Sequence, residues 1–345
     1  MSLTPSRPAC CLITGASGFI GSRLAARFAG AVGQAHVCMV RSEASAVALR
    51  GRGQRAVVAD LLRPAQVQQA LAGCDAVVHL AHGDRGPEAT RVLVQAAAAA
   101  RVRRFVHISS MSVHGPVPGP EAAFEDTARI GRYDHDYSDS KAEQEEIVQA
   151  AIDRGDLAAV ILRPTVVYGP GSHFVRQVVE QARAGELTMF DGGCGVCNAL
   201  HVDDLCAAID AALTRDEALG QAMFINADQP VSWGTFIGAF AALVSPAPRV
   251  VDLSSAEAMR YWAAQAPQAH PGLVSRVVRK LKSLGGWQPA PAPWPPAGRV
   301  MRETFPIAFA NGKARRLLAW APAVSFEQGV ASCVPWLQAE GLVAR

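Results

Sequence analysis

The sequence CCLITGASGFIG, at residues 10–21, joins an apolar run to a turn that is rich in glycine. The apolar run predicts a buried strand, and Gly15, Gly18 and Gly21 follow it at intervals of three residues. Such glycines let a strand-to-helix turn tighten, and they let the backbone approach a pyrophosphate at the helix N-terminus, where free N–H groups favour anions. The segment therefore predicts a dinucleotide site. The alternative is a glycine-rich turn without a ligand.

Further apolar runs alternate with helical patterns through the first half of the chain, at intervals of about 20 to 30 residues. These runs are apolar throughout, as expected for strands that are buried on both faces. The predicted strands are 10–14, 36–40, 55–59, 76–80, 105–109 and 160–162, and the predicted helices are 18–28, 64–71, 88–100 and 138–151. The pattern predicts an α/β fold, a Rossmann-type doubly wound parallel sheet.

The rhythm changes near residue 170 to longer helices and isolated strands. We expect a dinucleotide-binding domain over residues 1–170, which also receives parts of 200–227 and 307–345, and a smaller C-terminal substrate lobe, mainly residues 171–310. Within this lobe, the Pro-rich segment 289–296 predicts an extended loop. Residues 273–284 predict a basic amphipathic helix, which could pack on the lobe as a lid, or could touch a membrane surface or an anionic substrate.

The composition is that of a globular protein, with 50% hydrophobic and 18% charged residues. The 33 Lys and Arg residues and the 30 Asp and Glu residues give a net charge of +3 without a basic block, so we expect a small-molecule partner and no nucleic acid. No apolar run approaches the roughly 18 to 20 residues of a membrane span, and no signal segment precedes the first strand. We therefore expect a cytoplasmic location and no membrane span.

The 8 cysteines fall mostly within apolar segments and read as small buried hydrophobes. Cys194 and Cys197 have the spacing of metal ligands. Only His201 lies near them as a further candidate ligand, and a second cysteine pair is lacking, so we expect no metal.

Tyr137 and Lys141 are four residues apart and therefore share one face of a predicted helix. An ammonium close to a phenol stabilises the phenolate and lowers its pKa, so that Tyr137 could exchange a proton with a substrate hydroxyl near neutral pH. Tyr133, one turn earlier on the same face, is the alternative phenol.

Ser109, Ser110 and Ser112 follow the fifth predicted strand, at the end where an open α/β sheet places its ligands. A hydroxyl there can hold the reacting oxygen while Tyr137 moves the proton. The alternative interpretation is that these serines only stabilise the turn that follows the strand.

Arg41 directly follows the second strand, where a cofactor without a 2′-phosphate would meet an acidic side chain. A guanidinium suits a phosphate, so the sequence favours NADP, with NAD possible. Asp60, after the third strand, could accept from the adenine amino group, or it could cap the helix ahead of Pro64.

Taken together, the motifs resemble the extended short-chain dehydrogenase/reductases, also called the NAD-dependent epimerase/dehydratase family. The resemblance covers most of the chain and rests on the shared order and spacing of TGASGFIG at 14–21, VVADL at 57–61, VVHLAH at 77–82, VHISSMSVHG at 106–115, YSDSK at 137–141, LRPTVVYGPG at 162–171 and LHVDDL at 200–205.

The resemblance implies a catalytic set of Ser110, Tyr137 and Lys141. It implies that the cofactor is bound by Gly15, Ser17, Gly18, Phe19, Ile20, Gly21, Arg41, Asp60, Leu61, Leu80, Ala81, His82, Ser109, Tyr137, Lys141, Pro164, Val166 and Val167. Substrate contacts would come from Ser112, His114 and Asn198, with His114 standing where the family has a Tyr. The resemblance also implies a helix that starts near 201–204, and a homodimer through the helices near 88–100 and 138–151.

One departure from the family bears on the substrate. Many nucleotide-sugar enzymes of the family carry an Arg where this chain has Cys197, so a diphosphate would lack its expected partner unless Arg176, Arg183 or an Arg of the C-terminal lobe replaces it. The same lobe contains Trp262, Trp287 and Trp294, which favour a largely apolar ligand or else hold a small lobe together.

We therefore expect an NAD(P)-dependent oxidoreductase that transfers hydride at a carbinol or carbonyl carbon. A nucleotide-sugar epimerase, or a dehydratase, with tightly bound NAD(P) is the alternative. A non-catalytic NADP-binding sensor or scaffold is the third reading, and the intact Tyr137 and Lys141 pair argues against it.

Overall fold

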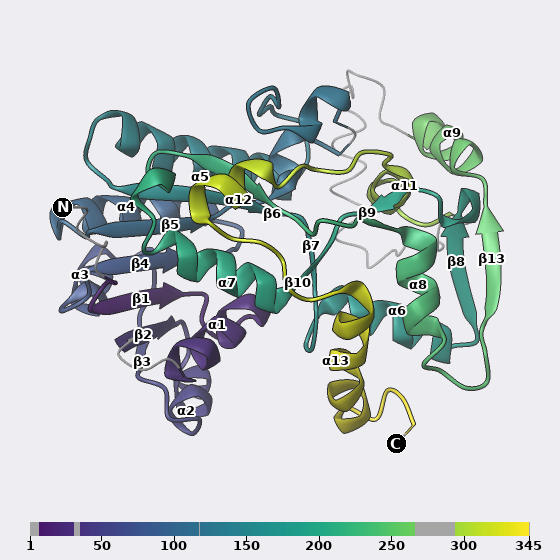
Figure 1. Cartoon of the computed structure of the whole chain (residues 1–345), viewed down its shortest axis with the longest axis horizontal. Coiled ribbons are helices and arrows are strands. Elements are labelled where there is room, and N and C mark those ends of the chain that lie inside the picture. Colours follow the sequence, from purple (N-terminus) through teal and green to yellow (C-terminus); the bar gives the residue numbers. More distant parts are fainter. Residues whose placement is uncertain (1–6, 31–34, 117, 266–293, 345) are drawn as a thin grey trace, which may run out of the picture.

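A seven-stranded parallel sheet forms the centre of the computed structural model, which describes residues 7–30, 35–116, 118–265 and 294–344. The strand order is β3-β2-β1-β4-β5-β6-β11 (Figure 1). The strands are β1 Cys10–Thr14, β2 Ala35–Val40, β3 Ala56–Val58, β4 Ala76–His79, β5 Arg104–Ile108, β6 Ala159–Pro164 and β11 Ala222–Ile225. The strand order reverses direction between β1 and β4, so the crevice for a ligand lies outside the carboxyl ends of these two strands.

Helices cover both faces of this sheet. Side chains of one face, such as Cys11 and Ile13, pack with those of α1 (Phe19–Gly30), α2 (Glu43–Arg50), α7 (Val202–Ala212) and α12 (Gly312–Leu318). Cys10 and Leu12 point to the other face, where α3 (Pro64–Leu71), α4 (Gly86–Ala99) and α5 (Asp136–Asp153) lie. Because both faces are covered, the strands are mostly apolar, with His79, Arg104, His107 and Arg163 among their few polar residues. The structure thus confirms the predicted doubly wound α/β fold.

The remaining elements form a second, smaller group at the opposite side of the molecule (Figure 1). Its short strands pair as β8 (Glu186–Phe190) with β13 (Arg249–Leu253), β7 (Val166–Tyr168) with β10 (Ala199–His201), and β9 (Val196–Cys197) with β12 (Val231–Ser232). Its helices are α6 (His173–Arg183), α8 (Trp233–Ala241), α9 (Ser255–Gln265), α11 (Ala297–Thr304) and α13 (Phe326–Ala339). Phe236 and Phe240 of α8 pack around Tyr168 in its core.

The predicted basic helix at 273–284, Trp287 and most of the Pro-rich segment 289–296 lie outside the described residues. Among the described helices, none has both the length and the apolar character that a bilayer crossing requires.

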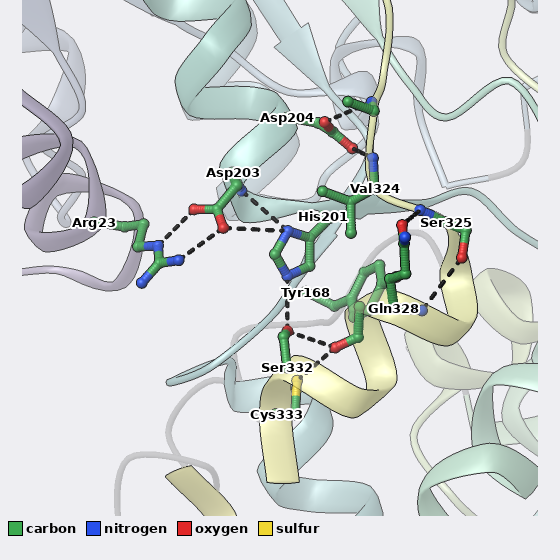
Figure 2. Close-up of polar contacts among 12 residues, drawn as sticks. Arg23, Tyr168, His201, Asp203, Asp204, Val324, Ser325, Gln328, Ser332 and Cys333 are labelled. Carbon is green, nitrogen blue, oxygen red and sulfur yellow. Dashed lines mark hydrogen bonds and ion pairs between the residues drawn. The ribbon is translucent and has the colours of Figure 1, made fainter. Parts of the chain in front are cut away.

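A hydrogen-bond network joins the two groups of elements (Figure 2). Arg23 of α1 donates to Asp203 at 2.7 Å, and the backbone N–H of Asp203 donates to His201 Nδ1 at 3.3 Å. Nδ1 is therefore an acceptor, so Nε2 carries the proton and donates to Ser332 Oγ of α13 at 3.1 Å. Since His201 cannot then take a proton from Ser332, this Ser–His–Asp order is a structural junction and not a nucleophilic site.

Asp204, the next residue of α7, binds the backbone of the segment that precedes α13. Its carboxylate accepts from the backbone N–H groups of Ala323, at 2.8 Å, and Val324, at 3.2 Å. The Asp204 side chain is buried, and burial raises the pKa of its carboxyl.

We expect Asp204→Ala to lower the free energy of unfolding by about 3 kcal/mol, because two backbone donors lose a charged acceptor in a buried place. Urea unfolding measures this change. The matched control is Asp203→Ala, whose half-exposed ion pair with Arg23 should cost no more than about 1 kcal/mol. Equal losses in the two variants would show that Asp204 does not hold the junction.

Candidate active site

A first cavity of about 420 Å³ lies at the carboxyl ends of β1, β2, β3 and β4. Four of the predicted cofactor segments meet there, although they are far apart in the sequence. Its wall contains Thr14, Gly15, Ser17 and Gly18 from the first turn, Arg41 after β2, Asp60 and Leu61 after β3, and Leu80, Ala81 and His82 after β4. The cavity therefore lies at the point where the strand order reverses direction.

Two glycines make this wall possible. Gly15 has φ +70°, and a Cβ on it would lie 2.8 Å from the backbone nitrogen of Ala81. A Cβ on Gly21 would lie 2.2 Å from the carbonyl oxygen of Gly15, so α1 also begins too close to the turn for any side chain there. Backbone N–H groups at a helix N-terminus and space beside them are what a pyrophosphate requires, so these residues fit a dinucleotide.

The two predicted polar contacts of the cofactor have different surroundings. Arg41 is exposed at the wall of the cavity. Asp60 accepts the backbone N–H of Leu62 at 2.9 Å, and the N-cap of α3 is Arg63, so Asp60 stabilises its own turn and is not the cap of the helix.

Sequence reasoning missed a buried chain of hydrogen bonds behind this cavity. The backbone N–H of Ala81 donates to Thr14 Oγ1 at 3.3 Å, and Thr14 bonds to His79 Nδ1 at 2.8 Å. His79 Nε2 bonds to Thr90 Oγ1 at 3.0 Å, and Thr90 donates to the carbonyl of Gly86 at 2.8 Å. The chain ties the end of β1 to the loop that follows β4. The sequence shows His79 only as one polar residue in an apolar strand.

The other predicted cofactor residues do not line the first cavity. Phe19, Ile20 and Gly21 begin α1, Ser109 is buried, and Pro164 and Val167 lie in β6 and β7. Val166 lines a second cavity instead. Their contact with a cofactor stays a prediction.

The second cavity, of about 370 Å³, lies between the end of β5, the start of α5 and the smaller group of elements. Polar residues of its wall are Ser110, Ser112, His135, Tyr137, Ser138, Thr165, Asn198 and Arg302. Its apolar residues are Met111, Pro116, Pro118, Val166, Phe174, Val196, Trp233, Phe305 and Phe309. The cavity thus combines apolar side chains with several polar groups.

Ser110 and Tyr137 are brought together at this wall. Ser110 Oγ accepts the backbone N–H of Ser112 at 3.2 Å, and the Ser110 side chain lies near enough to the Tyr137 phenol to lower its pKa. The surrounding protein desolvates the Tyr137 hydroxyl although 39% of the residue is exposed. This desolvation raises the pKa of Tyr137, and the Ser110 side chain opposes the rise.

Lys141 lies one turn further along α5, and its side chain is buried. Its Nζ donates to the backbone carbonyl of Ile108 at 2.8 Å, and burial lowers its pKa to about 8. The expected lowering of the Tyr137 pKa by Lys141 is not found in this arrangement, because desolvation dominates at the phenol and the ammonium is directed to Ile108.

The two cavities meet at a pair of rings. His82 lines the first cavity and Tyr137 the second, and their ring centroids are 4.9 Å apart in an edge-to-face arrangement. A ligand that reaches from the glycine-rich turn to Ser110 would therefore pass His82.

The three predicted substrate residues differ in placement. Ser112 lines the second cavity, and its Oγ is buried without a hydrogen-bond partner in the part of the chain that the structure describes. Asn198 also lines it, but its amide donates to the carbonyl of Ile307 at 2.9 Å and accepts from Phe309 N–H at 3.0 Å.

His114 does not line the cavity, which differs from the expected substrate contact. The ring is buried, Nδ1 bonds to the carbonyl of Arg129 at 2.8 Å, and Nε2 faces Arg163 Nη1 at 3.4 Å. Arg163 in turn pairs with the buried Glu145 of α5 at 2.7 Å. His114 therefore lies behind the wall of the second cavity and does not face its interior.

The expected absence of metal concerned Cys194, Cys197 and His201. Cys194 is exposed and Cys197 is buried, while both ring nitrogens of His201 are hydrogen-bonded elsewhere. No group of three or more His, Cys, Asp or Glu side chains among the described residues could hold a metal ion.

Three buried histidines around the site predict that the protein loses stability in mild acid. Burial lowers the pKa of His79 to about 3 and that of His114 to about 4, and it lowers the pKa of His107 well below its usual value. Below about pH 6.5 these histidines take up protons in the unfolded chain but not in the folded chain. Each of them should therefore lower the free energy of unfolding by about 2 kcal/mol between pH 7 and pH 5.

Urea unfolding at the two pH values measures the loss, and His107→Leu gives the control. Both ring nitrogens of His107 lack a partner among the described residues, so an apolar side chain of similar size should fold there. The variant should lose about 2 kcal/mol less than the unaltered protein over this range. An unchanged dependence on pH would mean that His107 is protonated in the folded protein.

Comparisons with known proteins agree with this geometry. The model of the NAD dependent epimerase/dehydratase family matches residues 11–227. The chain is 27% identical to a 2-alkyl-3-oxoalkanoate reductase of Stenotrophomonas maltophilia, over 92% of this chain and 96% of the relative. It is 28% identical to a protein of the same name from Shewanella oneidensis, over 64% of this chain and 62% of that relative. In fold it is similar to a UDP-glucuronic acid 4-epimerase from Bacillus cereus in complex with NAD, with a TM-score of 0.71, 19% identity, and 96% and 99% of the two chains covered.

Proposed function

Because the chain belongs to the NAD-dependent epimerase/dehydratase family, we propose that it is an NADP-dependent dehydrogenase or reductase for a carbinol or carbonyl group on a largely apolar small molecule. That it is an enzyme with NAD(P)-dependent oxidoreductase or epimerase activity follows from the family and its relatives. The proposal adds the cofactor preference, a net hydride transfer between substrate and cofactor instead of its return to the same molecule, and the nature of the substrate.

One observation carries the proposal. The Tyr137 phenol lies beside Ser110 at the wall of a cavity whose other residues are mostly apolar. A proton donor beside such a space suits a carbonyl on an apolar body. The relatives named as 2-alkyl-3-oxoalkanoate reductases support the same class of substrate, and the match to one of them covers 96% of its length.

In the proposed reaction, the bound nicotinamide supplies the hydride exchange, and the chain handles the proton. Ser110 orients the substrate oxygen, since Ser112 N–H already fixes the direction of its Oγ. Tyr137 donates its proton to that oxygen in reduction and accepts one in oxidation. Lys141 lies one turn away on the same helix. Its ammonium, which donates to the Ile108 carbonyl in this structure, would have to turn toward the phenol to favour the phenolate that reduction leaves behind.

The proposed cofactor contacts follow the first cavity. Gly15 and Gly18 would receive the pyrophosphate at the start of α1, and Asp60 would face the adenine. Arg41 would pair with a 2′-phosphate. The smaller group of elements, mainly residues 171–310, would bind the substrate.

The proposal predicts that the purified protein prefers NADPH to NADH, and that Arg41→Glu loses this preference. A charge-assisted pair with the phosphate is worth roughly 1.5 to 3 kcal/mol, or about 10- to 150-fold in Kd. Titration of both proteins with both cofactors measures it. Equal affinities in the unaltered protein, or a preference that survives in Arg41→Glu, would contradict the assignment.

Tyr137→Phe should abolish turnover and leave the Kd for NADPH nearly unchanged, because the phenol acts in the proton transfer and the ring still fills its space. Steady-state kinetics and cofactor titration give the two numbers. Tyr133→Phe is the matched control. The Tyr133 ring packs closely against Gly115, where an added Cβ would lie 2.6 Å from the ring. The ring therefore has a structural role, and the loss of the Tyr133 hydroxyl should change turnover little. The reverse result would mean that Tyr133 is the acid.

A nucleotide-sugar epimerase with tightly bound NAD(P) is the second candidate, favoured by the shared fold with a UDP-glucuronic acid 4-epimerase. An epimerase returns the hydride to its substrate, so the cofactor shows no net oxidation. Steady consumption of NADPH with an apolar ketone would separate the two candidates.

Two further expectations belong to the proposal, a cytoplasmic location and a homodimer through α4 and α5. Sedimentation of the purified protein tests the second.

A further inference from the structure

Arg302 brings a full charge to the second cavity. It lies in α11, and it is the one Asp, Glu, Lys or Arg residue in the wall of that cavity among the residues that the structure describes. Its guanidinium lies over the ring of Phe174, 5.3 Å from the centroid, and over the ring of Trp233 at 5.6 Å. The two rings hold the guanidinium by cation–π contact without using its hydrogen-bond donors.

The neighbouring acid does not satisfy Arg302. Glu303 Oε1 pairs with Arg299 Nε at 2.8 Å and with Arg302 Nη2 only at 3.5 Å. Among the described residues, two guanidiniums therefore share one carboxylate, so that one positive charge has no acidic partner of its own. Arg302 Nε has no hydrogen-bond partner among the described residues, and burial lowers the pKa of the guanidinium.

The Arg302 guanidinium lies near Cys197, the position where many nucleotide-sugar enzymes of the family carry an Arg. Arg302 is close enough to Cys197 to lower the pKa of the Cys197 thiol, against the stronger effect of burial. A cation is therefore supplied from α11 next to the residue that replaces the expected Arg. One guanidinium whose neighbour is already acidic matches a single negative charge better than a diphosphate.

We infer that Arg302 binds one carboxylate of the substrate, and that the substrate is a hydroxy or oxo acid with an apolar body. Met111, Val196, Phe305 and Phe309 would surround that body. The inference rests on the proposed function, since it names the substrate class of the same site. It makes Arg302 a residue that determines specificity and leaves the proton transfer to Tyr137.

The test uses pairs of ligands that differ only in charge. The protein saturated with NADPH is titrated calorimetrically with 3-hydroxyoctanoate, with the neutral 3-hydroxyoctanamide and with UDP. Neither hydroxy compound can be oxidised while the reduced cofactor fills the site, so binding is measured without turnover. The acid should bind about 10- to 100-fold more tightly than the amide, the range for a hydrogen-bonded ion pair.

Arg302→Met should remove this difference by weakening the acid alone. The matched control is Arg176→Met. Arg176 also lies over a ring, 5.4 Å from the centroid of Trp336, and pairs with Glu340 at 2.9 Å, but it does not line the cavity. This variant should keep the difference between acid and amide. Arg302→Lys, which keeps the charge and loses the planar fork, should retain part of it.

Equal binding of acid and amide by the unaltered protein would overturn the inference, as would UDP binding more tightly than the acid. The comparison in the unaltered protein holds even if a variant fails to fold. Consumption of NADPH with neutral ketones, combined with equal binding of acid and amide, would refute the role of Arg302 and keep the proposed function. A charge preference that Arg302→Met removes, in a protein that never consumes NADPH, would do the reverse.

Discussion

The close approach of the Gly15 backbone to the Ala81 backbone is the contact on which the site depends. A Cβ on Gly15 would lie 2.8 Å from Ala81 N, so the turn after β1 and the loop after β4 can only meet where one of them has no side chain. The buried bond between Thr14 and His79 holds the same two strand ends together from behind. Because the neighbouring strands are parallel, their carboxyl ends share this edge, and Ser110 after β5 is carried to the adjoining cavity.

Much of the sheet could be predicted because its strands are buried on both faces. An apolar run between two helical patterns has few other interpretations, and five of the six predicted strands lie within one residue of the observed bounds at each end, while β6 is longer by two residues at its C-terminal end. β11 was not predicted, since its four residues stand at the edge of the sheet and far in sequence from their partner β6. α2 was also missed. It is short, and its signal is the Ser42 cap, which a sequence also uses for ordinary turns.

The candidate site was predictable where it depends on local spacing and not where it depends on tertiary contact. Tyr137 and Lys141 share one turn of a helix, so their order alone placed them near each other. Their electrostatics could not be read in the same way. The carbonyl of Ile108, which takes the Lys141 ammonium, comes from β5, and the surrounding protein that raises the Tyr137 pKa comes from several elements. His114 shows the same limit. It stands in the expected motif, yet Arg129 and Arg163 bind its ring and remove it from the cavity.

The position of Arg302 shows how a charge can move within a site while the fold stays the same. The sequence showed only that an Arg was absent at Cys197, and it offered several replacements without a way to choose among them. Arg176 pairs with Glu340 instead and lies outside the cavity, whereas α11 carries Arg302 into the wall. A guanidinium held by Phe174 and Trp233, with Glu303 shared by Arg299, is fixed in place but not neutralised. The cavity therefore combines apolar walls with the incompletely paired cation of Arg302 and the phenol of Tyr137, and the substrate proposed here matches all three.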